Sequence, residues 1–172
     1  MDGYYYRAVV TGTCGLTTNS QAALLEVMAQ PPIITTATTV ADCEGTIVVP
    51  IMVEEFNNVA VISLGLQYDK NLLTYTGYQN VHPALSGAFF LINAPTTGNT
   101  VFVSWFSFAP ANIGNGKLMD LVFTSNGSGT GNLTWDPTPG TCQYQNAGGN
   151  LLLGTFNNGT VTVHPNPVPV VT

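Results

Sequence analysis

The sequence is poor in charge, and poorest in positive charge. Lys and Arg together number three against nine Asp and Glu, which gives a formal net charge of −6 in 172 residues. So few cations cannot neutralise a run of phosphates or cover an anionic bilayer. Binding to nucleic acid or to a charged membrane surface is therefore not expected.

Long apolar runs are also absent. No stretch approaches the roughly 20 residues of a membrane-spanning helix, so we expect no membrane insertion. The start Met1-Asp2-Gly3-Tyr4 lacks the basic and apolar regions of a secretory signal. The abundance of Thr, Asn, Gly and Val is typical of extracellular or cell-surface β-proteins, and in that case the chain is an excised piece of a longer protein.

Cysteine is scarce: the chain has Cys14, Cys43 and Cys142, without CxxC spacing and without neighbouring histidines. No metal site is therefore expected. In an oxidising compartment the three residues predict one disulfide, preferably Cys43–Cys142, and one odd thiol. Three unpaired thiols are the alternative.

Groupings that could carry catalysis are missing too. Glu54 and Glu55 are the only adjacent carboxylates, and neighbours in a strand point to opposite faces. His82 and His164 lie in proline-containing segments without a Ser, Cys or carboxylate context for a triad. There is no phosphate-binding loop and no calcium loop. We expect neither a catalytic site nor a bound cofactor.

What the chain does have is a series of β-forming segments bounded by Gly, Asn, Pro or Asp, which predicts an all-β sandwich. The expected strands span residues 33–40, 45–53, 59–68, 72–78, 88–92, 100–108, 117–124, 131–135 and 159–163. Residues 1–28 are expected to form a separate hairpin that resembles the last two strands of an immunoglobulin-like domain. Residues 29–32 and 164–172 read as proline-rich linkers.

The segment Val59–Asp69 has the clearest strand pattern, with large apolar residues alternating with small or polar ones. Asp69 is expected to turn the chain at its end. The core-facing residues would be Ile62, Leu64, Leu66 and Tyr68. The outward residues would be Val61, Ser63, Gly65 and Gln67.

The segment 100–108 carries more aromatic residues than one buried strand face needs. One parity holds Phe102, Ser104, Phe106 and Phe108, and the other holds Val101, Val103, Trp105 and Ser107. Whichever set points inward, a large aromatic set remains outside, which is common on protein- or sugar-binding surfaces. Trp105 in the core, with a bulge that rearranges the parity, is an equal alternative, and Trp135 is expected in core or rim packing.

Four segments in order resemble the strands of a cohesin module, the receptor half of the cohesin–dockerin pair. They are Gly45-Thr-Ile-Val-Val-Pro-Ile51, Val61–Asp69 with Leu72-Leu73, Gly116-Lys-Leu-Met-Asp-Leu-Val-Phe123 and Asn158-Gly-Thr-Val-Thr-Val163. The resemblance covers residues 33–163. It implies a nine-stranded jelly-roll sandwich without catalytic activity, related to carbohydrate-binding modules.

The resemblance also implies where a dockerin would dock, with calcium held by the dockerin. The positions are Val61, Ser63, Gly65, Gln67, Val103, Trp105, Ser107 and Phe108. Asn and Asp, common in the family at the positions of Val61 and Ser63, are absent here, which reduces hydrogen bonding on this face.

Three functions follow in order. The first is a dockerin-binding module, with Trp105 as anchor, in a polysaccharide-degrading (cellulosome-like) or surface assembly. The second is a carbohydrate-binding module that stacks a polysaccharide on Trp105 or Trp135 together with a tyrosine. The third is a structural subunit that exchanges strands through residues 3–27.

Overall fold

The computed structural model describes residues 4–25 and 30–167. Contacts divide the chain into two units, residues 1–30 and residues 31–172. None of the described segments forms an apolar helix long enough to cross a membrane.

The first unit is a hairpin of four short strands. β1 (Tyr4–Tyr6) pairs antiparallel with β4 (Ala23–Leu25), and β2 (Val9–Thr11) pairs antiparallel with β3 (Thr17–Asn19). Ser20 joins the two halves, because its N–H donates to the Ala8 carbonyl and its Oγ accepts from the Ala8 N–H, both at 2.9 Å. The side chains described in this hairpin are all exposed. Two strands alone cannot bury a core.

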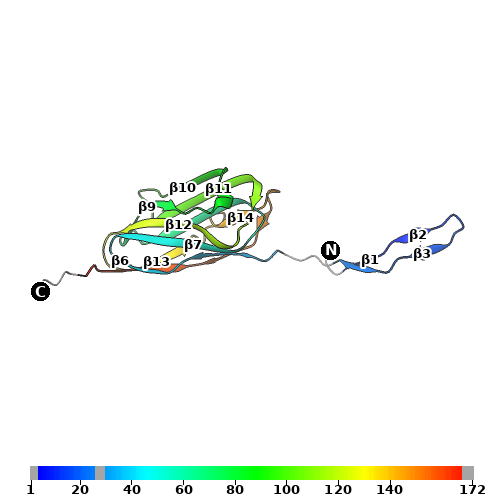
Figure 1. Ribbon diagram of the computed structural model, residues 1–172, viewed down its shortest axis with the longest axis horizontal. Coiled ribbons are helices and arrows are strands. Elements are labelled where there is room, and N and C mark those ends of the chain that lie inside the picture. The colour runs from blue at the N-terminus through cyan, green and yellow to red at the C-terminus, as the bar shows by residue number, and fades with distance from the viewer. Residues whose placement is uncertain (1–3, 26–29, 168–172) are drawn as a thin grey trace. The chain divides into compact units, whose positions relative to one another are not determined.

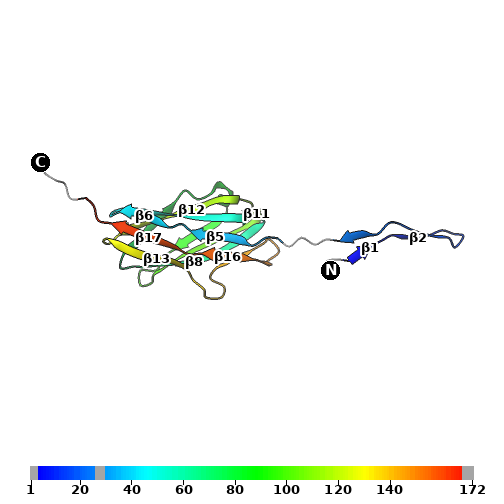
Figure 2. The ribbon, with the colours of Figure 1, turned by 90° about the horizontal axis from the view of Figure 1, so that it is seen from below.

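The second unit is a sandwich of two sheets (Figures 1 and 2). The larger sheet runs in the order β10 (Phe89–Asn93), β11 (Thr100–Ala111), β8 (Val59–Tyr68), β13 (Gly129–Trp135), β17 (Gly159–His164) and β6 (Val40–Cys43). Beyond the end of β13, β14 (Gln143–Gln145) pairs with β8, and β15 (Leu151–Leu152) pairs with β14. The smaller sheet runs in the order β16 (Gly154–Asn157), β5 (Ile33–Ala37), β7 (Thr46–Phe56), β12 (Gly114–Ser125) and β9 (Leu73–Gln79).

Alternate residues of the central strands fill the space between the sheets. They include Ile47, Val49, Ile51 and Val53 from β7, and Ile62, Leu64 and Leu66 from β8, none more than 2% exposed. Each such side chain stabilises the fold by about 1.5–3 kcal/mol when fully buried. The Phe123 ring contacts the rings of Tyr68 and Tyr75 at centroid distances of 5.2 and 5.7 Å. The predicted inward parity of β8 is confirmed.

The turn after β8 is built as its residues predict. The Asp69 carboxylate accepts the Asn71 N–H at 2.9 Å, and the Asp69 carbonyl accepts the N–H groups of Leu72 and Leu73. A short acidic side chain that caps its own backbone in this way fixes a tight turn. β9 therefore returns in the smaller sheet, on the other side of the core.

The predicted fold class, an all-β sandwich, is confirmed. Each of the nine expected strands has a counterpart, and the structure adds four short strands, β6, β14, β15 and β16. Three of these lie in residues 143–157, where Gly and Asn hide the alternation of a strand. The fourth, β6, follows a break after Ala37 that moves the chain from the smaller sheet to a parallel pairing with β17.

The expected Cys43–Cys142 disulfide is wrong, because Cys14, Cys43 and Cys142 are all free thiols. Cys43 lies opposite His164 at one end of the larger sheet, whereas Cys142 precedes β14, which pairs with Ser63 near the other end. A disulfide needs Cα atoms within about 7 Å of each other. Sequence spacing gave no information about these positions.

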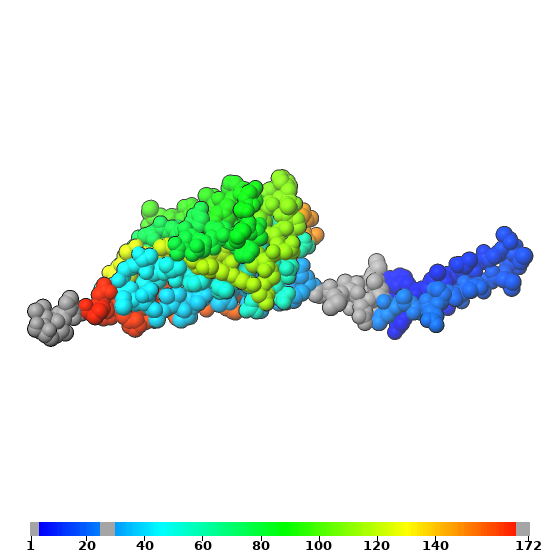
Figure 3. Space-filling model, in the orientation of Figure 1, coloured from blue at the N-terminus to red at the C-terminus, as the bar shows by residue number. Residues whose placement is uncertain are grey.

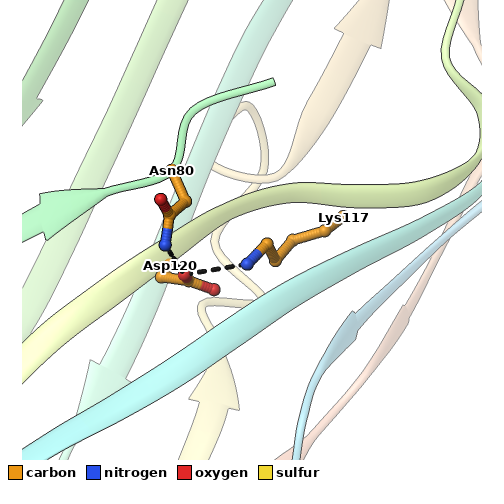
Figure 4. A network of polar contacts seen from close by, with 3 residues as sticks. All are labelled: Asn80, Lys117 and Asp120. Atoms are coloured by element: carbon orange, nitrogen blue, oxygen red, sulfur yellow. Dashed lines mark hydrogen bonds and ion pairs between the residues drawn. The ribbon is translucent and has the colours of Figure 1, made fainter. Parts of the chain in front are cut away.

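A polar cluster lies where β12 meets the end of β9 (Figure 4). The Asp120 side chain is 3% exposed, and its Oδ2 accepts Asn80 Nδ2 at 2.7 Å and Lys117 Nζ at 2.9 Å. Asp120 Oδ1 has no hydrogen-bond partner within the described chain. Two donors on one oxygen hold the carboxylate in place, and both are needed because a buried carboxylate is costly when unpaired.

Candidate functional site

The outer face of the larger sheet presents side chains in rows that cross β10, β11 and β8. Directly opposite residues of antiparallel strands point to the same side of a sheet. The rows are Phe89–Phe106–Val61, Leu91–Ser104–Ser63 and Asn93–Phe102–Gly65. Because Ile62 and Leu64 of β8 point into the core, the residues in these rows point outward.

The outward residues of β10 and β11 form an exposed apolar surface, which we call the aromatic ridge. It consists of Phe89, Leu91, Phe102, Phe106 and Phe108, with exposed fractions from 39% for Phe102 to 88% for Phe108. The segment coloured green in Figure 3, to which β10 belongs, forms a continuous flank of the sandwich next to β11. Several large apolar side chains left in contact with water on one flank are characteristic of an interaction surface.

A bulge at the end of β11 shapes the ridge. The pairing of β11 with β8 shifts between Phe106 and Ala111, in a stretch that includes Pro110, which has no N–H to donate. Within the bulge the Ser107 Oγ accepts the Ala109 N–H at 3.2 Å. The rings of Phe106 and Phe108 meet edge to face with centroids 4.9 Å apart. Of the predicted contact residues, Ser107 is half-buried here and Phe108 is fully at the surface.

The prediction that Val103 and Trp105 face outward is wrong. Val103 lies opposite Leu64, and Trp105 lies opposite Ile62, so both share the inward direction of those residues. Trp105 is 2% exposed, and its Nε1–H donates to the Leu85 carbonyl at 2.9 Å, in the 3₁₀ turn η1 (Pro83–Leu85). The indole is therefore a core residue and cannot be a surface anchor.

Because Val103 and Trp105 point inward, the alternate residues of β11 point outward, and these residues together with β10 supply the exposed aromatic side chains. Phe89, Leu91, Phe102 and Phe106 were not among the predicted contact positions. The available signal was the second parity class of residues 100–108, which placed Phe102, Phe106 and Phe108 together. Choosing between the two classes requires the register between β11 and β8, and this register connects residues about 40 positions apart in the chain.

The outward direction of Val61, Ser63, Gly65 and Gln67 is confirmed for β8, but one of them is covered. Gly65 is buried, and a Cβ at that position would lie 2.5 Å from Thr141 Cγ2. Residues 136–142, which we call the 136–142 loop, leave the sheet after β13 and cross the outer face of β8 at this point. Gly65 therefore seats the loop and is not free for a partner.

The same loop also accepts hydrogen bonds from the Ser63 side chain of β8. Ser63 Oγ donates to the carbonyls of Gly140 and Thr141, each at 3.3 Å. The Asp136 N–H donates to the Gly65 carbonyl at 2.8 Å, and Cys142 Sγ lies 3.5 Å from that same oxygen. The loop is thereby fixed at both ends against β8.

The 136–142 loop carries two titratable side chains, Asp136 and Cys142. Hydrogen bonds from the side chain and then the backbone N–H of Thr138 hold the pKa of Asp136 below its ordinary value. Burial raises the pKa of the Cys142 thiol. A hollow of about 400 Å³ opens beside the loop, lined by Trp135, Phe156 and Asn158 among others.

The prediction that Trp105 or Trp135 stacks a sugar at the surface is wrong for both indoles. Trp135 is 6% exposed, its Nε1–H donates to the Asn157 carbonyl at 2.9 Å, and its ring packs on Phe156 at 5.9 Å. Neither ring offers an open face on which a sugar could stack.

No protein-family model and no curated protein sequence matches the chain. Solved structures match its fold. A non-cellulosomal cohesin from the hyperthermophilic archaeon Archaeoglobus fulgidus aligns with a TM-score of 0.66 and 20% identity over 78% of this chain and 92% of its own. The sixth cohesin of Acetivibrio cellulolyticus scaffoldin B, in complex with a Cel5 dockerin variant, gives 0.66 and 16% over 78% and 100%. A type I cohesin–dockerin complex from Clostridium thermocellum gives 0.68 and 12% over 83% and 99%.

Proposed function

We propose that residues 31–167, which have the fold of cohesin domains, form a non-catalytic protein-recognition module for a dockerin-type partner. The single observation that carries the proposal is the aromatic ridge on the outer face of β10 and β11. The sequence resemblance places dockerin contacts on this same face, on the strand that ends in Tyr68-Asp69 and on the strand 100–108. Two of the three structural neighbours named above are described as dockerin complexes.

The composition of the ridge supports a protein ligand. Binding energy at protein interfaces is concentrated in a few large side chains that become fully buried, and aromatic residues are frequent among them. Phe106 is central in the ridge, because it lies between Phe89 on β10 and Val61 on β8 and its ring contacts Phe108. We assign it the anchor role that the sequence had suggested for Trp105.

The wider setting follows from the same proposal. A dockerin would bring its own calcium, so the module needs no cofactor. The module would act at the cell surface or outside the cell, in an assembly that degrades polysaccharide or decorates the surface.

The test is capture of dockerins by the full chain, with a matched pair of variants. A panel of purified type I and type II dockerins is passed over immobilised protein with calcium and with a chelator. We expect calcium-dependent capture of at least one dockerin, about tenfold weaker or more for Phe106→Ala, and unchanged for Met52→Ala, an exposed apolar residue on the smaller sheet. Capture of no dockerin contradicts the proposal.

The hairpin favours a second candidate function, strand exchange with a β-domain of another molecule. Tyr4, Tyr5, Val9, Val10 and Leu16 are each more than half exposed, although they are the residues that a sheet would normally bury. Completing a partner's sheet would cover them. Analytical ultracentrifugation of the full chain and of residues 31–172 tests this candidate. An assembly that forms only with the hairpin supports it, and two identical monomers contradict it.

A further inference from the structure

The strands around the aromatic ridge carry no charge. Seven of the eight strands in the larger sheet contain no Asp, Glu, Lys or Arg, and the exception is β6, which holds Asp42. The three basic and nine acidic residues of the chain all lie on other strands and connections. The acidic side chain at this face is Asp136 of the 136–142 loop, which lies beside Gly65. A partner placed over β10 and β11 finds no charge on these strands to pair with, and a charged side chain opposite the ridge would be buried unpaired, which is costly.

Part of the outer face of β8 is already covered by the 136–142 loop. Ser63 Oγ is hydrogen-bonded to two carbonyls of the 136–142 loop, and Gly65 lies under Thr141. The Phe102 ring borders the same spot, at 3.5 Å from the position of a Cβ on Gly65. The open part of the face thus begins at Phe102 and extends over β11 and β10, away from the loop.

The ridge is large enough to form the centre of an interface. A phenylalanine buries about 150–250 Å², so the exposed parts of Phe89, Phe102, Phe106 and Phe108 would lose on the order of 400 Å² to a partner. A standard interface takes about 800 Å² from each side. The ridge would supply about half of that area, and the strands that carry it, β10 and β11, are uncharged.

Building on the proposed function, we infer that the dockerin-type partner contacts this module through an uncharged apolar helix stripe, centred on β10 and β11 instead of on β8. An amphipathic helix with apolar residues at positions i, i+3, i+4 and i+7 presents such a stripe. Recognition then depends on apolar burial and shape. The reduced hydrogen-bonding capacity at Val61 and Ser63 fits this kind of partner, because an apolar stripe offers few polar groups to bond with.

Isothermal titration of the captured dockerin into the full chain tests the inference. Between 0.1 and 1 M NaCl the screening length falls from about 10 to about 3 Å, and we expect the affinity to change by less than about threefold across that range. Phe106→Ala and Phe89→Ala should each weaken binding by about tenfold or more. Phe89 lies on the edge strand, so it serves as the second variant if Phe106→Ala folds poorly, and Met52→Ala is the control.

The outcomes separate the inference from the proposed function. A dockerin that binds with steep salt dependence, or that is lost in Gln67→Ala and retained in Phe106→Ala, overturns the inference and leaves the proposed function standing. Failure of every dockerin to bind contradicts the proposed function, and the inference with it. A dimer of this chain that dissociates on Phe106→Ala would assign the ridge to a second copy and would also overturn the inference.

Discussion

The methyl group of Thr141 occupies the space into which any side chain at position 65 would project. A Cβ on Gly65 would lie 2.5 Å from Thr141 Cγ2 and 3.4 Å from Asp136 Cβ. The absence of a side chain on β8 is therefore what allows the 136–142 loop to lie flat on the sheet. The loop in turn covers the middle of β8, so the most exposed apolar side chains of this face lie on β10 and β11.

Gly65→Ala should lower the free energy of unfolding by about 1–3 kcal/mol, the usual cost of an added methylene in a packed site. The loop must move, so the amides of residues 140–142 should also exchange hydrogen faster. Gly77→Ala is the matched control, because a Cβ at Gly77 meets no atom within 4 Å. Equal stability of the two variants in urea would show that the loop is not seated on Gly65.

Trp105→Phe should destabilise the fold, because it removes the N–H that satisfies the buried Leu85 carbonyl. An unsatisfied buried acceptor costs about 1–3 kcal/mol. Phe106→Ala, one residue along, truncates a ring that is already 41% exposed and should change stability by less than about 1 kcal/mol. Urea unfolding of both variants measures the two losses of stability. A larger loss for Phe106→Ala than for Trp105→Phe would place Trp105 at the surface.

Lys117→Met should destabilise the fold by about 1 kcal/mol, since it leaves the buried Asp120 carboxylate with Asn80 as its remaining donor. The expected destabilisation is small because the Lys117 side chain is 39% exposed and water screens its charge. Adding Asp120→Asn to Lys117→Met should recover part of the loss, because a neutral amide needs no cation. A double variant no more stable than Lys117→Met alone would contradict this role.

Stability should fall as the solution becomes alkaline. Burial raises the pKa of Tyr75 to about 12, with a smaller contribution from Tyr78, and burial also raises the pKa of Tyr144. In the unfolded chain these phenols lose their protons near pH 10. Above that pH the unfolded state binds fewer protons than the folded state, so the free energy of unfolding decreases from about pH 10 upward.

The measurement is urea unfolding between pH 8 and pH 11, with Tyr144→Phe as the comparison. Removing this phenol also removes its hydrogen bond to Thr35, so the variant should be less stable at pH 8. Its stability should nevertheless fall less steeply above pH 10. Parallel pH profiles of the two proteins would contradict the assignment.

Local pattern predicted much of the fold, and the failures have a common physical cause. The alternation from Val61 to Tyr68 and the turn at Asp69 are decided by neighbours in sequence, and both are found as predicted. The orientation of Trp105 depends on its pairing with Ile62, which no local pattern specifies. The cover over Gly65 depends on Thr141, 76 positions further along the chain, in a loop without periodicity.

Site-specific photo-crosslinking within the bound complex shows which outer face of the sandwich the partner covers. Phe106→p-benzoylphenylalanine and Met52→p-benzoylphenylalanine place the same reactive ring on the two outer faces of the sandwich. If the dockerin docks on the aromatic ridge, we expect a crosslink to it from position 106 and none from position 52. A crosslink from position 52, with none from position 106, would contradict it.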